Sequence, residues 1–315
     1  MNNIKVSIVI PTLNGGEDFN KCLTSIYSQK VDFHFEVIVI DSGSTDETVF
    51  VAKEFPVRLY QIDKKEFNHG LTRNKGIGLS KGELVVLITQ DAIPANEYWL
   101  QSLIKPFSED AMVAGVYARQ IPREDADVLT KKRLNRWLTG RMERDVKYIT
   151  DKASYDKLPP IQKYMFCNFD DVCSCVKRSV WKRIPFEETT FAEDLVWSKK
   201  VIEGGFKIVY EPSAAVIHSH NRSVFYEYNR IYINHRKLNE LFGVQTVPAL
   251  SNVVFLTLRN IVADILYVVR KERNFQKMIS LLIRVPLLSF LGVYAQYKGA
   301  RDQMERRELK PLEGV

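Results

Sequence analysis

The strongest constraint on the fold is a stretch of five apolar residues, 84–88, that leads within three positions to a single carboxylate, Asp91. Gly82 precedes the run and Pro94 follows it. An unbroken apolar run of this length between turn residues is typical of a parallel strand buried on both faces. Because ligands of open α/β sheets bind at the carboxyl ends of such strands, we expect Asp91 to lie at a binding edge. Capping of the turn is the alternative role for a lone Asp.

Two earlier segments repeat this arrangement of an apolar strand followed by polar turn residues. Residues 5–10 and 36–40 are rich in Val and Ile, and the second run leads directly into another carboxylate, Asp41. Segments with helical periodicity follow both, and residues 57–62 form a third predicted strand. Such strand–loop–helix units predict a right-handed, doubly wound, mostly parallel α/β sheet. The first strand is not followed by G-x-G-x-x-G, which argues against an NAD-binding fold.

The following part of the chain continues the pattern less regularly. Residues 119–162 are dense in charge, and we expect them to form insert helices and loops over the site. The other predicted elements are a helix at 96–107 and strands at 112–118, 172–176, 206–210 and 214–217.

A further polar segment, residues 67–76, precedes the strand that leads to Asp91. Arg73 and Lys75 are predicted to open a helix whose N-terminus faces a diphosphate. Positive residues in a first turn oppose the helix dipole, which suggests that an anion lies nearby. A solvated, basic first turn is the alternative.

Two pairs of candidate site residues come later in the chain. Glu193 and Asp194 are predicted to lie in the first turn of a helix, with Thr190 and Glu193 as a capping box. Capping alone would explain the two carboxylates. His218 and His220 end the last predicted strand at i and i+2, so their side chains point the same way. That geometry suits a metal or a diphosphate, although such a pair on its own is more often structural.

Charge is unevenly distributed along the 315 residues, whose formal net charge is +7. From Ser219 onward there are 15 Lys and Arg against 8 Asp and Glu, whereas the preceding part is balanced. This argues against a nucleic-acid-binding core and for a basic C-terminal surface that faces an anionic partner. The four cysteines lack C-x-x-C spacing, which predicts reduced, buried thiols. The chain enters a strand without an apolar signal segment, so we expect a cytoplasmic protein.

The C-terminal part differs in character, and we expect two domains, 1–220 and 221–315. Residues 253–297 are largely apolar, with a polar stripe at helical spacing. The longest uncharged stretch, 285–297, is shorter than the ~20 residues that span a bilayer. An apolar face with a basic edge predicts helices that lie in a membrane surface. Packing on the catalytic domain, or on a second copy in a homodimer, is the alternative.

Jointly, these segments resemble the inverting family 2 glycosyltransferases, which have a GT-A fold. The resemblance covers about the first 220 residues and rests on residues 6–12, 41–46, 91 and 193–194. Residues 67–74, 89–92 and 192–197 further resemble the rhamnosyltransferase branch of this family, whose donor is usually dTDP-L-rhamnose.

The resemblance implies roles for the residues of the nucleotide-sugar site. Thr12 and Asp41 would line the nucleotide base, and Arg73 would reach the base or the diphosphate. Asn14 and Gly43 belong to the same two loops and would also bind the nucleotide sugar.

The resemblance also implies roles in catalysis. Asp91 matches the last Asp of the D-x-D motif, which binds Mg²⁺ or Mn²⁺ directly. The sequence departs from this motif at Gln90, where many relatives carry another carboxylate. The remaining metal ligands would therefore come from the donor diphosphate, from water and from one of the two histidines. Asp194 matches the catalytic base, which takes the proton from an acceptor hydroxyl. Trp197 would line the acceptor site or pack in the core.

We therefore expect a metal-dependent transferase that moves L-rhamnose to a glycan or lipid-linked glycan during cell-surface polysaccharide synthesis, at the cytoplasmic face of the membrane. A family 2 enzyme that uses a UDP-hexose and a non-catalytic scaffold of a glycan-assembly complex are the alternatives. A nucleotidyltransferase would share the sheet, but it normally has a Gly-rich loop with a cation after the first strand. Residues 14–17 contain no cation.

Overall fold

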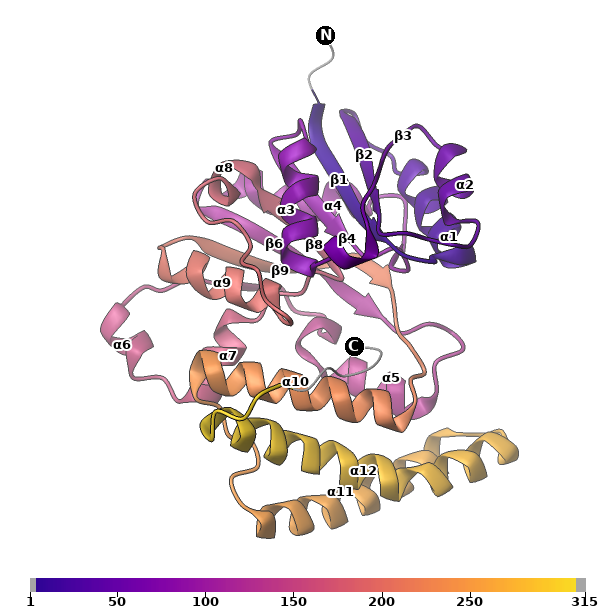
Figure 1. Ribbon diagram of the computed structural model, residues 1–315, viewed down its shortest axis with the longest axis vertical. Coiled ribbons are helices and arrows are strands. Elements are labelled where there is room, and N and C mark those ends of the chain that lie inside the picture. Colours follow the sequence, from indigo (N-terminus) through magenta and orange to yellow (C-terminus); the bar gives the residue numbers. More distant parts are fainter. Residues whose placement is uncertain (1–3, 310–315) are drawn as a thin grey trace. The chain divides into compact units, whose positions relative to one another are not determined.

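The structure, a computed structural model that describes residues 4–309, contains two compact units (Figure 1). The first unit comprises the chain up to Arg123 together with Leu134–Tyr155 and Cys167–Ser219. The second comprises Glu124–Arg133, Asp156–Phe166 and the chain from His220 onward.

The first unit is built on a sheet with strand order β3-β2-β1-β4-β8-β6-β9-β5, in which β7 also pairs with β9. The pairs β3–β2, β2–β1, β1–β4 and β6–β9 are parallel, whereas β8 is antiparallel to both of its neighbours. The predicted α/β class, with a helical C-terminal part, is confirmed. The strands are β1 (Ile4–Thr12), β2 (His34–Asp41), β3 (Val57–Gln61), β4 (Leu84–Ile88), β5 (Ile93–Pro94), β6 (Val113–Ile121), β7 (Asp145–Lys147), β8 (Cys173–Lys177) and β9 (Lys207–Ile217).

Most connections between the strands contain helices. These elements are α1 (Gly16–Tyr27), α2 (Thr48–Lys53), η1 (Lys64–Glu66), α3 (His69–Leu79), α4 (Trp99–Glu109), α5 (Val128–Arg136), η2 (Leu138–Gly140), α6 (Lys152–Asp156), α7 (Pro160–Cys167), α8 (Arg178–Trp181) and α9 (Glu193–Glu203).

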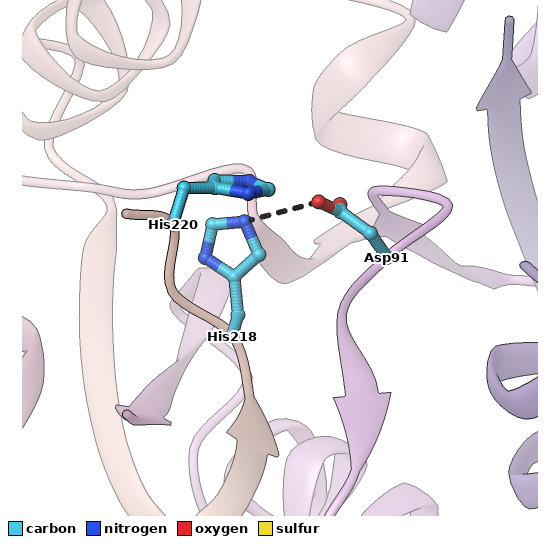
Figure 2. Close-up of side chains that lie close together, drawn as sticks. All are labelled: Asp91, His218 and His220. Carbon is cyan, nitrogen blue, oxygen red and sulfur yellow. Dashed lines mark ion pairs between the residues drawn. The ribbon is translucent and has the colours of Figure 1, made fainter. Parts of the chain in front are cut away.

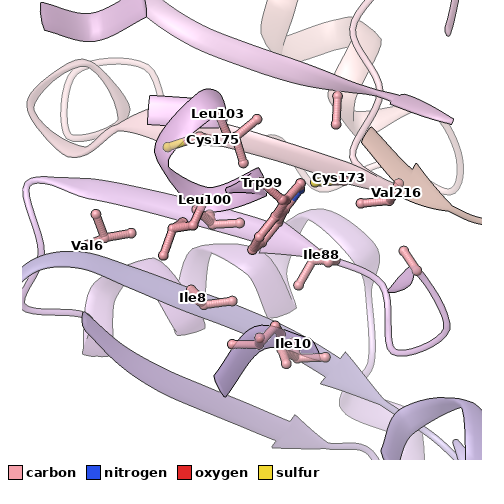
Figure 3. Close-up of a cluster of buried hydrophobic side chains, with 14 of the residues drawn as sticks. Val6, Ile8, Ile10, Ile88, Trp99, Leu100, Leu103, Cys173, Cys175 and Val216 are labelled. Atoms are coloured by element: carbon pink, nitrogen blue, oxygen red, sulfur yellow. The ribbon is translucent and has the colours of Figure 1, made fainter. Parts of the chain in front are cut away.

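The main hydrophobic core lies between one face of the sheet and helices α1 and α4 (Figure 3). Trp99 and Leu103 of α4 are fully buried there, next to Ile8 of β1. Each such side chain contributes about 1.5–3 kcal/mol on burial. Cys173 and Cys175 of β8 belong to the same core, and all four cysteines are buried and free, as predicted.

Helix α3 approaches the sheet unusually closely. A Cβ added to Gly76 would lie 2.3 Å from Cγ1 of Val9 in β1, so only glycine allows this spacing. The helix begins at His69, and its N-cap is Asn68, whose side chain accepts a hydrogen bond from the Leu71 amide. The expectation that Arg73 opens the helix is therefore wrong by one turn.

Two other predictions about secondary structure need correction. The two strands expected at 206–210 and 214–217 are one long strand, β9, which begins at Lys207. The pairing of β9 with β6 shifts register between Ala118 and Arg119, so a bulge accommodates Pro212 without ending the strand. Helix α9 has no capping box: its N-cap is Ala192, in the left-handed region at φ 57°, and no side chain caps it.

The second unit contains the long helices α10 (Val224–Phe242), α11 (Leu250–Lys271) and α12 (Phe275–Met304). Val268 of α11 and Val285 of α12 are buried in one apolar cluster with Leu129 of α5. Both α11 and α12 are long and apolar enough to cross a membrane, by length and composition alone. The expectation that no segment here is long enough to span a bilayer is therefore wrong. It rested on the longest stretch without any charged residue, whereas a spanning helix can contain one or two charges. Long Lys and Arg side chains can reach a membrane surface from within such a helix.

Candidate functional site

Three side chains that are partly exposed, those of Asp91, His218 and His220, form the candidate metal site (Figure 2). One ligand atom from each lies within 4.8 Å of the others. His218 Nε2 is 3.7 Å from Asp91 Oδ2. His218 follows β9 directly, and His220 is joined to it through Ser219. The structure thus brings together the carboxylate and the two histidines that the sequence singled out.

A two-residue strand explains how Asp91 reaches the histidines. Strands β8 and β6 lie between β4 and β9 in the sheet, so the end of β4 is not adjacent to the end of β9. The chain leaves β4, passes through Asp91 and pairs as β5 with the far side of β9, with Ile93 opposite Ile217. This crossing carries Asp91 to the end of β9, next to His218. The sequence indicated only that Pro94 ends the segment.

The donor atoms of this cluster fit a divalent transition metal. Imidazole nitrogen suits transition metals, whereas Mg²⁺ prefers oxygen ligands almost exclusively. One carboxylate with two imidazoles therefore fits a divalent transition metal better than Mg²⁺.

Gln90, the departure from the family pattern, has a different task. Its Oε1 accepts a hydrogen bond from the Leu13 amide at 2.9 Å, and its Nε2 donates to the Leu13 carbonyl at 3.0 Å. A carboxylate could make the first contact but not the second, because it has no donor when ionised. Gln90 therefore joins the loop after β4 to the loop after β1.

The predicted nucleotide loops follow β1 and β2, whose register places Thr12 opposite Asp41. Asp41 is completely buried, and its Oδ2 accepts hydrogen bonds from the amides of Gly43 and Ser44. Asn14, at φ 48°, accepts a hydrogen bond from the Thr45 amide through Oδ1. Asp41 and Asn14 thus shape these two loops from within, and their contact with a nucleotide stays a prediction.

Arg73 lies inside a group of carboxylates. Its guanidinium is buried, pairs with Glu193 and lies 3.4 Å from Asp171 Oδ2. The anion that the basic residue suggested is therefore supplied by the protein itself, from segments about 100 and 120 residues further along. The predicted role of Arg73 at the base or diphosphate stays a prediction.

Asp194, the predicted catalytic base, lies in the first turn of α9 and is partly exposed. Its Oδ1 accepts a hydrogen bond from the Leu195 amide at 2.7 Å, and its Oδ2 accepts one from the Asp171 amide at 3.3 Å. Burial, followed by the negative charges of Glu193 and Asp171, raises the pKa of Asp194 well above its usual value. A carboxylate with a raised pKa is a stronger base when it is ionised, as the proposed role requires.

Trp197 is a core residue rather than part of an acceptor wall. It is completely buried, and its ring stacks on Phe186 at a centroid distance of 5.3 Å. Its Nε1 donates to the Ile184 carbonyl at 2.8 Å. These contacts decide between the two roles that the sequence left open.

Sequence reasoning missed Arg123, which anchors the loop that carries Asp91. Its guanidinium donates to the Asp91 carbonyl at 2.7 Å and to Asp18 Oδ1 at 2.8 Å. Its backbone amide donates to Ser219 Oγ at 2.9 Å. Arg123 thus connects the segments that carry Asp91 and His218. A single Arg in a charged insert carries no signal that would have revealed this.

Comparison with known proteins identifies the family and the fold. The family model described as Glycosyl transferase family 2 matches residues 7–175. The O-antigen chain rhamnosyltransferase RfbN of Salmonella typhimurium is 33% identical over 233 residues, which is 73% of this chain and 71% of the relative. A second O-antigen chain rhamnosyltransferase, WbaN of Salmonella anatum, is 31% identical over 230 residues, which is 72% of this chain and 70% of the relative.

Solved structures share the fold at lower identity. The mannosyltransferase PcManGT of Pyrobaculum calidifontis, in complex with GDP-Man and Mn²⁺, superposes with a TM-score of 0.60 at 17% identity, over 96% of this chain and 88% of the other. TarS 1-349 of S. aureus, in complex with UDP-GlcNAc, gives 0.52 at 15% identity, over 99% and 95%. The chain has the GT-A fold and belongs to glycosyltransferase family 2.

Proposed function

We propose that the protein transfers L-rhamnose from dTDP-L-rhamnose to a hydroxyl of a lipid-linked glycan, with inversion and with a divalent metal. The observation that carries the metal dependence is the meeting of Asp91, His218 and His220 at the carboxyl ends of the strands. The names of the relatives RfbN and WbaN support rhamnose and an O-antigen type of acceptor.

The residues divide the work of an inverting transfer between two places. Asp91 and the histidines would hold Mn²⁺, which supplies positive charge beside the leaving nucleoside diphosphate. Asp194 would take the proton from the acceptor hydroxyl as that oxygen attacks the anomeric carbon of the donor. The loops shaped by Asp41 and Asn14 would hold the nucleotide.

The test is a donor screen with the full chain and a membrane fraction that contains lipid-linked glycan. We expect sugar release or transfer from dTDP-L-rhamnose in Mn²⁺, less in Mg²⁺ and none in EDTA. Asp91→Asn should remove the dependence on Mn²⁺ together with most of the activity. Turnover of a UDP-hexose instead would identify the alternative donor class, and no turnover of any donor would favour a scaffold. A product with retained anomeric configuration would reject Asp194 as base of an inverting reaction.

We also propose that the second unit binds the protein to an anionic membrane surface, where such an acceptor would lie. Helices α11 and α12 expose a series of large apolar side chains, with Phe255 at 64% and Ile283 at 73% of their area. Arg273 and Lys277 lie at the connection between these helices. Exposed apolar area next to cations fits a lipid surface, to which each cation contributes ~1 kcal/mol.

Co-sedimentation with vesicles tests this membrane proposal. Ile283→Ser with Phe255→Ser should weaken binding to anionic and neutral vesicles alike. Arg273→Gln with Lys277→Gln should weaken binding to anionic vesicles only, as salt does. Phe50→Ser is the matched control, because Phe50 is 66% exposed but lies on α2. If the wild type binds no vesicle and is a dimer that the apolar substitutions dissociate, the surface is a homodimer interface.

A further inference from the structure

A buried glutamine, Gln120, lies beside the candidate metal site and has no role in the proposed transfer reaction. It is the last but one residue of β6 and is 6% exposed. Its Oε1 is 3.1 Å from His218 Nδ1, and its Nε2 donates to Asp170 Oδ2 at 2.9 Å. Asp170 is anchored in turn, because its Oδ1 accepts a hydrogen bond from the Val172 amide at 2.9 Å.

The contact with Asp170 determines which way round the amide of Gln120 lies. An ionised carboxylate can only accept hydrogen bonds, so the NH₂ group of Gln120 must face Asp170. The oxygen of the amide then faces His218 Nδ1. An amide oxygen can only accept, so His218 Nδ1 must carry the ring proton.

The tautomer of His218 follows from this chain of contacts. With the proton on Nδ1, a neutral imidazole has its lone pair on Nε2. Nε2 is the atom that lies 3.7 Å from Asp91 Oδ2. The lone pair therefore points into the cluster of candidate ligands, as a metal ligand requires.

We propose that Gln120 is a positioning residue that holds His218 in the Nδ1–H tautomer and orients Nε2 toward a divalent metal. The metal part of this inference rests on the proposed function, whereas the tautomer rests on the hydrogen bonds alone. Partners of this kind typically change metal affinity by about 10–100-fold when they are removed.

The first experiment measures Mn²⁺ binding alone, by electron paramagnetic resonance, in the full chain. Gln120→Met has a similar shape and no hydrogen bonds, so it should weaken Mn²⁺ binding about 10–100-fold. The double variant Gln120→Glu with Asp170→Asn exchanges the donor and the acceptor between the two positions while it preserves the total charge. It restores an acceptor for His218 Nδ1 and should recover most of the affinity. A purely structural role for Gln120 predicts a lower melting temperature without this pattern of loss and recovery.

The second experiment is independent of metal binding. The ¹⁵N chemical shifts of the histidine rings in the wild type, assigned by comparison with His218→Asn, should show His218 protonated on Nδ1 and not on Nε2. An Nε2–H tautomer, or unchanged Mn²⁺ affinity in Gln120→Met, would overturn the inference. If the wild type binds no Mn²⁺ while His218 is the Nδ1–H tautomer, the proposed metal dependence fails and the role of Gln120 in holding the ring stands.

Discussion

Two groups of titratable residues in this protein have opposite surroundings. The first group, Asp91 with His218 and His220, lies near the end of β9, and all three side chains are partly exposed. Between α3 and α9, the carboxylates of Asp171 and Glu193 are buried around the guanidinium of Arg73. The first group brings together atoms that can ligate a metal, whereas the second contains its own cation.

This difference shows that a strand or helix terminus does not by itself determine what a carboxylate does. Asp91 follows a strand and Glu193 begins a helix, and both positions are typical of ligand binding. Glu193 is engaged with Arg73, whereas its neighbour Asp194 is the proposed catalytic base. The burial of the second group then adjusts the proton affinity of Asp194.

The largest effect that would sharpen this contrast is expected for Asp194→Asn. The amide keeps the size of the side chain but cannot accept the acceptor proton, so kcat should fall ~10²–10⁴-fold. Nucleotide affinity, measured by calorimetry with dTDP and Mn²⁺, should stay close to wild type. Glu203→Gln, at the other end of α9, is a control with the same change of charge. An unchanged kcat in Asp194→Asn would assign proton abstraction to another group.

The next largest effect should come from Arg73→Met, which removes the cation from the buried group. Two buried carboxylates are then left without a cation, and loss of one member of a buried ion pair costs about 3–5 kcal/mol of unfolding free energy. Lys75→Met makes the same change of charge on the same helix, but Lys75 is exposed, so its effect should stay within about 0.5 kcal/mol. Urea unfolding measures both. Equal effects would mean that the buried group is not electrostatically dependent on Arg73.

A pH dependence should further distinguish the buried group. Burial, opposed by Arg73 and reinforced by Glu193, raises the pKa of Asp171 to about 7. The folded protein then holds a proton that the unfolded chain releases near pH 4. Stability from this residue is therefore greatest at low pH and is lost as the pH rises from about 4 to about 7. The difference in unfolding free energy between wild type and Asp171→Asn should follow that course, and a difference that is constant with pH would contradict it.

The smallest effect is expected for Gln90→Glu, next to Asp91 in the chain. The substitution removes the hydrogen bond to the Leu13 carbonyl and should cost about 1–3 kcal/mol in thermal or urea unfolding. It adds a carboxylate of the kind that many relatives carry, yet we expect no gain in Mn²⁺ affinity, because the side chain is directed at Leu13. Tighter Mn²⁺ binding in Gln90→Glu would show that this side chain can turn toward the metal.

The sequence predicted much of the first unit because its strands are continuous apolar runs with local signals at their ends. Asp41, Asp91 and Asp194 could each be selected from the residues immediately around them. The contacts that decide their roles are not local: Arg73 meets Glu193 120 positions away, and Gln90 meets Leu13 77 positions away. No periodicity or propensity records such a pairing.

The same limit applies to the elements that were missed. Strand β5 has two residues and gains its identity only from its pairing with β9. Arg123 and Gln120 lie at or near the end of β6, and their value comes from the backbone and side chains that the sheet brings to them. By contrast, the histidine pair could be predicted from the sequence, because residues at i and i+2 in an extended segment point to the same side.

The double hydrogen bond between Gln90 and Leu13 has a consequence for how the two loops respond to ligands. The loop after β1 belongs to the predicted nucleotide site and the loop after β4 carries Asp91, so a shift in either is transmitted to the other. Binding at two sites joined in this way is reciprocal: whatever factor the metal adds to nucleotide affinity, the nucleotide adds to metal affinity. If the proposed metal and nucleotide bind at these loops, an amide at position 90 would couple the two bound groups instead of supplying one more anionic ligand.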